Sequence, residues 1–410
     1  MNIPELLAPA GNHEKLITAL HYGADAVYMG LSEFSLRARA DNFSSEGLER
    51  SAQFVRQQGK KLYITINIFP HNKDIALIKD HLVRLKTVHP DGIVLSDPGI
   101  FELASETAPE IPVHISTQAN VTNYRSAQFW ENMGAKRIVL ARELSIDEIK
   151  EIRDSVSLEL ECFVHGSICI SYSGRCYMSS FLNNRSGNRG ECTNTCRWNY
   201  MLMEESRPGE YFPVYENERG TYVMSSRDLC MIGHLDRLAD AGMSSFKIEG
   251  RMKGINYVAG VVKTYREAVD SLKERPYRAK EQWMKELSMS SNRGFTTGMF
   301  LGRRSDDGYN HDDDKAYRMS HELVGVVTSV RNGTATVALR NNLSIGDSIE
   351  FLTTGLENQM MEVAEMYNPK GTCITSGRNE ETVSIPILKG VREHDLIRRP
   401  VHSHQGSCRL

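Results

Sequence analysis

The stretch AGMSSFKIEGR, residues 241–251, begins with a glycine turn and continues as a short run of alternating apolar and polar residues. Successive side chains of a β-strand point to opposite sides, so Phe246 and Ile248 share one face. The other face carries Lys247, Glu249 and Arg251. A glycine shortly before or at the start of an apolar run recurs in YGADAVYMG (22–30), PDGIVLSD (90–97) and MGAKRIVLAR (133–142). This recurrence indicates a repeated strand–helix unit.

Eight runs of this kind precede residue 270, and amphipathic helical stretches separate them. They span residues 4–10, 25–30, 61–67, 91–97, 113–118, 137–143, 158–166 and 244–250. Eight such units predict a (β/α)8 TIM-like barrel over residues 1–290. The alternative is a doubly wound open sheet, but no Gly-rich phosphate loop follows the first strand.

Several of the predicted strands carry a polar face. A barrel strand packs one face on the helices and turns the other inward, so we expect a polar interior. Active sites of this fold lie at the carboxyl ends of the strands. The candidate catalytic residues are His165, Glu249 and Lys247, and the candidate substrate-binding residues from the strands are Asn67, Gln118, Arg142 and Arg251. A buried network of mutually satisfied structural residues is the alternative interpretation.

About 80 residues (166–243) separate the seventh predicted strand from the eighth, far more than is usual for a βα loop. This insertion carries four of the eight cysteines, spaced C-x6-C-x15-C-x3-C: Cys169, Cys176, Cys192 and Cys196. Four thiolates suit either a structural zinc or an iron–sulfur cluster, and unligated reduced thiols are the third interpretation. Cys230 is an alternative ligand. We expect Cys162 to be a core residue, and Cys373 and Cys408 to be structural or incidental.

The same insertion is locally basic and aromatic. Its basic residues are Arg175, Arg185, Arg189 and Arg197, against the single acid Glu191. Together with Tyr172, Tyr177 and Trp198 they could hold a phosphate backbone and stack a base, which makes Arg175 and Arg197 further candidates for substrate binding. An ordinary solvated loop is the alternative.

A change of pattern follows the barrel. Residues 291–318 are expected to form a connector, residues 319–400 a small all-β barrel, and residues 401–410 a tail. Asn332-Gly333 between alternating runs predicts a hairpin turn. Residues 321–400 hold 8 Lys+Arg and 10 Asp+Glu, so charge does not mark this part as RNA-binding.

Composition narrows the function classes. The chain has 49 Lys+Arg against 52 Asp+Glu, which gives no global attraction to nucleic acid or to an anionic membrane. Neither a signal peptide nor a long apolar run is visible, so we expect a cytoplasmic protein that does not span a membrane. No H-E-x-x-H or G-x-S-x-G motif occurs. A Cys169 nucleophile with His165 as its base is conceivable, but it leaves the neighbouring cysteines unexplained.

The run His165-Gly166, Cys169, Tyr172-Ser173-Gly174-Arg175-Cys176, Ser179, Gly190, Cys192 and Cys196-Arg197-Trp198 resembles the signature of peptidase family U32, the collagenase-like family. The segments ELLAPAG, FKIEGR and NRGFTTG are similar too, and the resemblance covers essentially the whole chain. Several members of this family are implicated in oxygen-independent hydroxylation. Length, the GECTNTCRW segment and a single C-terminal β domain are most similar to the branch that hydroxylates tRNA.

The resemblance implies a 4Fe–4S cluster held by Cys169, Cys176, Cys192 and Cys196, with Cys230 as the alternative ligand. It also implies tRNA as the substrate, 5-hydroxylation of the wobble uridine as the reaction, and prephenate, a small dicarboxylate, as a co-substrate. Two hypotheses from other classes stand beside it. One is a collagenase-like peptidase, and the other is a non-catalytic subunit of a modification complex with a structural metal.

Overall fold

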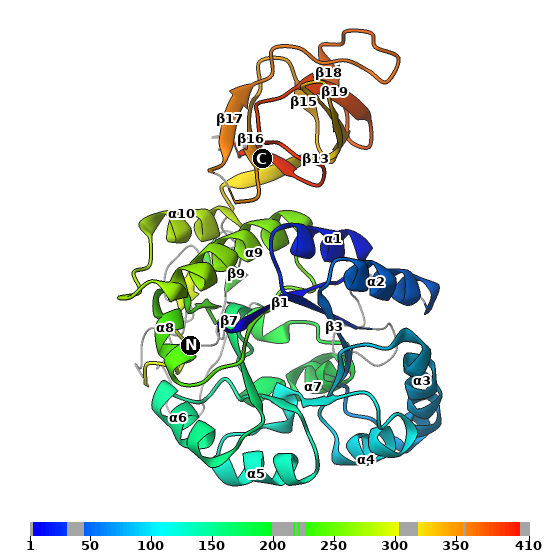
Figure 1. Cartoon of the computed structure of the whole chain (residues 1–410), viewed down its shortest axis with the longest axis vertical. Helices are drawn as coiled ribbons and strands as arrows, with labels where there is room; N and C mark the ends of the chain where they lie inside the picture. Colours follow the sequence, from blue (N-terminus) through cyan, green and yellow to red (C-terminus); the bar gives the residue numbers. More distant parts are fainter. Residues whose placement is uncertain are drawn as a thin grey trace.

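The computed structural model describes residues 3–30, 45–198, 216–217, 220–221, 226–302, 319–355 and 357–401. A large unit holds a ring of strands surrounded by helices, and a smaller all-β unit stands at one end of it (Figure 1). The predicted tail from residue 402 and most of the predicted connector, residues 303–318, lie outside the described residues.

Eight parallel strands close into a barrel, because β1 pairs with β2 on one side and with β11 on the other, and β11 also pairs with β7. The strands are β1 (Glu5–Pro9), β2 (Ala26–Gly30), β3 (Lys61–Ile66), β4 (Gly92–Leu95), β5 (Val113–Ile115), β6 (Arg137–Val139), β7 (Glu159–Ser167) and β11 (Ser245–Ile248). All eight predicted runs form strands, so the predicted barrel is confirmed and the open sheet is excluded.

Helices cover the outside of the barrel. They are α1 (His13–His21), α2 (Ser45–Gln57), α3 (Ile75–Val88), α4 (Pro98–Thr107), α5 (Tyr124–Asn132), α6 (Ile146–Ser155), α8 (Leu235–Asp240), α9 (Ile255–Asp270) and α10 (Glu281–Met289). Capping residues in the sequence mark where several of these helices begin. Asn12 caps α1, Asp97 caps α4 with proline at the first helical position, and Ser145 with Glu148 forms a capping box on α6.

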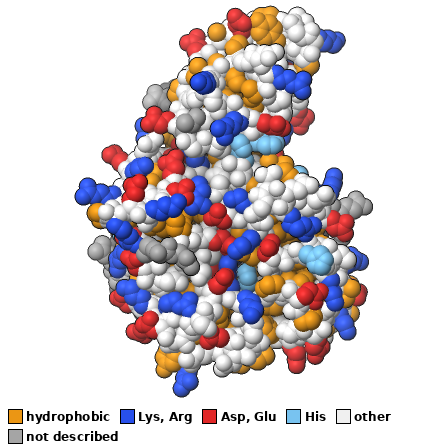
Figure 2. Space-filling view, in the orientation of Figure 1, with side chains coloured by type: hydrophobic (Ala, Val, Ile, Leu, Met, Phe, Trp, Pro, Cys, Tyr) orange, Lys and Arg blue, Asp and Glu red, His pale blue; other side chains and the backbone are white. Residues whose placement is uncertain are grey.

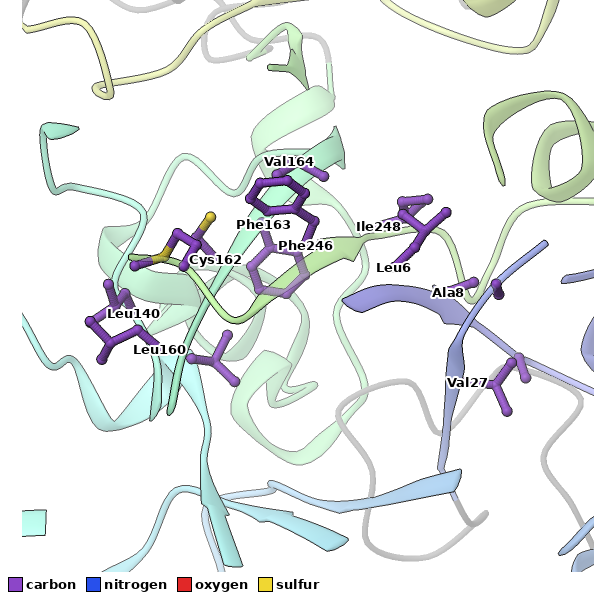
Figure 3. Packing of buried hydrophobic residues seen from close by; sticks show 14 of the residues in the cluster. Leu6, Ala8, Val27, Leu140, Leu160, Cys162, Phe163, Val164, Phe246 and Ile248 are labelled. Carbon is purple, nitrogen blue, oxygen red and sulfur yellow. The ribbon is translucent and has the colours of Figure 1, made fainter. Parts of the chain in front are cut away.

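The outward faces of the strands build the main apolar core against these helices. Residues such as Leu6, Ile64 and Phe246 are buried there, and Figure 3 shows Cys162 within the same apolar cluster, as predicted. The inward face carries a smaller cluster of Leu7, Ala26, Tyr28, Tyr63 and Val94. The interior is therefore polar only in part.

A network of ion pairs lies inside the barrel, between residues of β1, β6, β7 and β11. Arg137 on β6 contacts Glu5 at 2.7 Å and Glu161 at 3.0 Å, and Glu161 also accepts from Lys247 Nζ at 2.9 Å. Burial raises the pKa of Glu161, but Lys247 and Arg137 outweigh this effect and hold it below its ordinary value. Lys247 thus forms an ion pair inside the barrel with Glu161.

Two short strands extend the sheet beyond the barrel. β10 (Asp228–Cys230) pairs antiparallel with the end of β7, and β12 (Phe295–Thr296) pairs with β10. Residues 295–296 of the predicted connector therefore belong to this extension. The remaining pieces of the insertion are α7 (Met178–Asn183), the short 3-10 turns η3 (Tyr172–Gly174), η4 (Gly187–Arg189) and η5 (Thr195–Arg197), and the two-residue strands β8 (Glu216–Asn217) and β9 (Gly220–Thr221).

The C-terminal unit is a six-stranded antiparallel sheet in the order β17-β16-β20-β13-β14-β19, curled into a half-barrel, with a two-stranded pair, β15–β18. Its strands are β13 (His321–Arg331), β14 (Thr334–Leu339), β15 (Leu343–Ser344), β16 (Ser348–Leu352), β17 (Gln359–Glu362), β18 (Ser376–Gly377), β19 (Thr382–Pro386) and β20 (Leu396–Pro400). Asn332 and Gly333 both have positive φ between β13 and β14, which confirms the predicted hairpin.

The two units share a buried interface. Leu352 and Leu396 of the C-terminal sheet belong to the core of the large unit. The Tyr22 hydroxyl donates to the Leu352 carbonyl at 2.6 Å and accepts from the Leu396 N–H at 2.9 Å. Arg398, fully buried on β20, reaches Glu286 of α10 at 2.6 Å and Glu350 of β16 at 2.5 Å.

Candidate active site at the barrel mouth

A pocket opens at the carboxyl ends of the barrel strands. Its lining includes six of the sequence-predicted residues: Asn67, Gln118, Arg142, Lys247, Glu249 and Arg251. Its volume is about 50 Å³. Since one ordered water needs roughly 10–15 Å³ in this measure, the pocket has room for a few waters or one small polar group. The strands thus bring together residues that lie far apart in the sequence.

One wall of the pocket is neutral and polar. Asn67 Nδ2 lies 3.4 Å from both Ser116 Oγ and Gln118 Oε1, and the Ser116 hydroxyl donates to Gln118 Oε1. Gln118 does not extend β5, because residues 117–119 form a 3-10 turn that ends in a left-handed Asn120. This turn lets Gln118 reach the rim of the pocket.

The opposite wall combines cations with aromatic rings. The Arg142 guanidinium lies 4.3 Å from the centroid of the Phe163 ring, and its buried Nε has no hydrogen-bond partner among the described residues. Lys247 Nζ lies 4.5 Å from the Tyr28 ring centroid. Buried Arg251 donates to Thr65 Oγ1 at 3.1 Å. The site therefore offers positive charge in a partly dry environment, which suits an anionic group.

Glu249 supplies the carboxylate of the pocket. Its oxygen lies 3.0 Å from the Tyr28 hydroxyl. Its backbone is held as well, since its N–H donates to the His165 carbonyl and its carbonyl accepts from the Tyr257 hydroxyl, both at 2.9 Å. Gly166, at φ 106°, allows this close approach, because a Cβ there would lie 2.4 Å from the Glu249 carbonyl oxygen.

His165 does not line this pocket, so its expected place in the barrel interior is wrong. The register between β11 and β7 shifts after Lys247, so that Ile248 pairs with His165. The ring consequently packs against Tyr265, Phe295 and Tyr257, with centroids 5.2, 5.7 and 6.0 Å away. Burial lowers the pKa of His165 to about 4, and its Nδ1 has no hydrogen-bond partner within the residues that the structure describes. The imidazole is therefore neutral near pH 7.

The cysteine segment, defined here as residues 168–198, is fastened over the pocket rim. The Glu143 carboxylate accepts from the Ser173 N–H and hydroxyl, both at 2.6 Å. Arg175 Nε donates to the Gln118 carbonyl at 2.9 Å. A third fastening joins Arg189 to Asp74 through two contacts of 2.6 and 3.0 Å.

The four cysteines of this segment are partly exposed. Cys176 precedes α7, and Cys192 lies against the same helix, 3.9 Å from the Ser179 hydroxyl. Cys196 lies in η5, which packs on α7. In the described part of the chain no three His, Cys, Asp or Glu side chains gather as ligands of one ion. What fits a metal cluster is therefore the donor set itself: four accessible soft ligands on one segment.

Cys230 has a different environment from these four. Its thiol is buried in the main core, 3.8 Å from the Tyr265 hydroxyl and 4.0 Å from the Met284 sulfur. Burial raises the pKa of Cys230 to about 11, which disfavours the thiolate that a metal needs.

The predicted substrate-binding residue Arg197 cannot be placed in the site, because its side chain lies outside the described residues.

Sequence reasoning did not identify four residues that shape the site. Tyr28 and Phe163 line the pocket, while Glu143 and Asp74 fasten the cysteine segment. Alternation along β2 predicts that Tyr28 faces inward. No local pattern marks Asp74, because its partner Arg189 lies 115 residues away.

Comparison with known proteins gives a consistent result. The family described as Peptidase family U32 matches residues 11–310, and the Peptidase family U32 C-terminal domain matches residues 319–398. The chain is 37% identical over 403 residues to tRNA hydroxylation protein P1 of Bacillus subtilis (strain 168), covering 97% of this chain and 94% of the relative.

Two further relatives are similar over nearly their full length. tRNA hydroxylation protein P of Escherichia coli (strain K12) is 37% identical over 428 residues, covering 94% of both chains. A protein named Collagenase from Porphyromonas gingivalis (strain ATCC BAA-308 / W83) is 33% identical over 413 residues, covering 96% of this chain and 97% of the relative. With its barrel, its cysteine segment and its C-terminal half-barrel, the chain belongs to peptidase family U32.

Proposed function

We propose that this protein is an iron–sulfur enzyme that modifies tRNA, installing a 5-hydroxyl group on the wobble uridine in an oxygen-independent, prephenate-dependent reaction. The observation that carries the proposal is the 37% identity, over nearly the whole chain, to two relatives named tRNA hydroxylation proteins. The substrate, tRNA, comes from those names. The pocket and the cysteine segment support the chemistry that such a reaction needs.

The proposed cluster ligands are Cys169, Cys176, Cys192 and Cys196. Their partial exposure suits metal binding better than the buried thiol of Cys230, which remains the alternative ligand. When bound by all four cysteines, a 4Fe–4S cluster supplies one-electron chemistry, and an open coordination position on iron would require one iron to lack a cysteine ligand. A structural zinc on the same thiols is the alternative and supplies neither redox chemistry nor, with four cysteine ligands, an open position.

The proposed roles of the pocket residues follow from their contacts. Arg142 offers a buried Nε that has no hydrogen-bond partner in the described part of the chain, so it is the first candidate to receive a carboxylate such as one of the two in prephenate. Arg251 and Lys247 add positive charge on the same wall, although Lys247 also serves Glu161. Asn67 and Gln118 can orient a neutral polar group.

Glu249 is the preferred group for proton transfer, since its carboxylate faces the pocket and is oriented by Tyr28. His165, the other proton-transfer candidate from the sequence, is proposed instead as a positioning residue, because its carbonyl accepts from the Glu249 N–H while its ring packs outside the pocket. Replacing Glu249 by Gln keeps the shape and removes the proton acceptor. We expect it to abolish turnover while substrate binding persists.

Two measurements test the proposal. Anaerobically purified protein should absorb broadly near about 400 nm and contain stoichiometric iron and sulfide. Serine variants of the four segment cysteines should lose this absorbance, whereas the exposed and distant Cys373→Ser should keep it. Stoichiometric zinc without iron would overturn the cluster. Deleting the gene should remove 5-hydroxyuridine from tRNA as measured by nucleoside mass spectrometry, and an unchanged profile would overturn the reaction.

The collagenase-named relative favours a second candidate, a collagenase-like peptidase. It requires a nucleophile, and the conceivable pair is Cys169 with His165. The His165 ring faces the aromatic rings of α9 and β12, which weighs against its acting as a base for a thiol on the segment. Cleavage of gelatin by highly purified protein, abolished by Cys169→Ser, would favour this candidate. Hydroxylation by the isolated chain would exclude the third, a non-catalytic subunit.

A further inference from the structure

The cysteine segment presents unusually exposed aromatic side chains. Phe181 is 76% exposed and Tyr177 is 73% exposed, the two highest values among the large hydrophobic side chains of the described residues. Tyr172, on the same segment, is 54% exposed. An exposed ring costs free energy in water, so several of them on one short segment indicate a surface that contacts something else.

Tyr177 and Phe181 lie on the same side of α7. They are four residues apart, and the Phe181 N–H donates to the Tyr177 carbonyl at 2.9 Å, as in a regular helical turn. The other side of the helix is anchored, because the buried Ser179 hydroxyl contacts the Thr195 hydroxyl at 3.4 Å. The two rings are therefore held outward on a fixed support.

The segment itself carries more basic than acidic residues. Arg175 is exposed and Arg185 is half-buried, and Glu191 is the only acid within the segment. Arg189 contributes little to this field, since Asp74 neutralises it. On the face seen in Figure 2, by contrast, basic and acidic side chains are mixed over the large unit. The positive charge is therefore a local property of the segment.

This surface begins at the rim of the pocket. Arg175 donates to the carbonyl of Gln118, a residue that lines the pocket, and its guanidinium lies 5.6 Å from the Phe69 ring centroid. In Figure 1, α7 projects within the ring of outer helices. A chain laid across α7 would thus run directly to the barrel mouth.

We propose that Tyr172, Tyr177, Phe181, Arg175 and Arg185, named here the α7 face, bind the unpaired bases of a single-stranded RNA loop. The rings stack on bases next to the nucleotide that enters the barrel mouth, and the arginines contact the backbone phosphates. Outward rings beside cations suit unpaired bases rather than a duplex, whose bases are already stacked. The identity of the ligand as RNA rests on the proposed function, and the assignment of this surface goes beyond it.

The test uses the full-length protein and fluorescence anisotropy. The probes are a labelled RNA hairpin with an unpaired loop and a fully paired RNA duplex of the same length. The wild type should prefer the hairpin. Tyr177→Ala and Phe181→Ala should each weaken hairpin binding by roughly 5- to 100-fold, the range expected for one lost base stack. Phe129→Ala on α5, also an exposed ring at 52%, is the matched control and should bind as the wild type does.

Two further variants separate stacking from other causes. Phe181→Tyr keeps a ring and should bind normally, whereas Phe181→Leu keeps apolar bulk without a ring and should bind weakly. Arg175→Gln and Arg185→Gln should each lower the slope of log affinity against log salt by about 1. Equal binding by the Leu and Phe forms would overturn stacking. A change in oligomeric mass of the Ala variants would instead assign the face to a second copy of the chain.

Failure of this inference can be told apart from failure of the proposed function. If the wild type hydroxylates tRNA and the Tyr177 and Phe181 variants bind and react as it does, the α7 face is wrong and the function stands. If the wild type binds no RNA hairpin and tRNA keeps its modification in the gene deletion, both are wrong.

Discussion

The buried Arg398 offers the sharpest test of how the two units are joined. Its side chain is fully inaccessible and contacts two carboxylates that are themselves 13% and 11% exposed, Glu286 and Glu350. Replacing Arg398 by Met keeps similar volume and removes the cation that directly contacts both carboxylates. Removing one partner of a buried ion pair costs about 3–5 kcal/mol, and the slight exposure of both acids favours the lower end, about 3 kcal/mol.

The matched control is the next residue. Arg399 also contacts two carboxylates, Glu322 and Asp347, but its side chain is 20% exposed and theirs are 29% and 30% exposed. Arg399→Met should therefore cost no more than about 1 kcal/mol, as is usual for ion pairs in contact with water. The two variants remove the same charge from the same strand and differ mainly in burial.

Urea unfolding followed by circular dichroism measures the difference. We expect a clear drop in the unfolding midpoint for Arg398→Met and almost none for Arg399→Met. Adding Glu286→Gln and Glu350→Gln to the first variant should restore much of the loss, because the uncompensated charges are then gone. A midpoint for Arg398→Met equal to that of Arg399→Met would refute the reasoning from buried charge.

Burial raises the pKa of Glu161, but Lys247 and Arg137 outweigh this effect and hold the pKa below its ordinary value. Its carboxylate therefore stabilises the folded state above about pH 4.3, and this stabilisation is lost as the pH falls. The urea midpoint of the wild type should fall between pH 5 and pH 3, and that of Glu161→Gln should fall less steeply. Gly166→Ala should displace the backbone of Glu249 and strongly reduce the proposed tRNA hydroxylation, whereas Gly59→Ala, which meets no atom within 4 Å, should not. Equal activity of the two variants would contradict the close-approach argument. Asp74→Asn should remove the ion pair of Arg189, which keeps only its hydrogen bond to the Phe69 carbonyl, and speed tryptic cleavage within residues 168–198 while the barrel stays intact. The exposed Asp80→Asn is the control, and equal cleavage rates would show that the ion pair does not hold the segment.

Local pattern was enough to predict the barrel. The glycine turns and the period-two alternation are properties of neighbouring residues, so the strand that contains Lys247 and ends just before Glu249 could be recognised without any knowledge of its partners. The hairpin at Asn332-Gly333 is predictable for the same reason, since both residues tolerate positive φ.

The prediction for His165 failed because it depended on a partner strand. Alternation along β7 predicts that the His165 ring lies on the same inward face as Glu161 and Phe163. The register shift between β7 and β11 turns the ring toward Tyr265 of α9 instead. The fastenings of the cysteine segment are equally invisible to local pattern, because Ser173 and Glu143 lie 30 residues apart. Burial and long-range pairing, rather than propensity, decide these details.

The contact between Tyr22 and Leu396 has a consequence for synthesis on the ribosome. The two residues are 374 positions apart, so at about 5–20 residues per second Tyr22 is made roughly 20 to 75 s before its partner. Once β11 and α9 have been made, the barrel can close, but the surface that Leu352 and Leu396 later cover still faces water. Until the C-terminal sheet is made, the nascent barrel therefore carries an uncovered part of its apolar core, of the kind that chaperones protect.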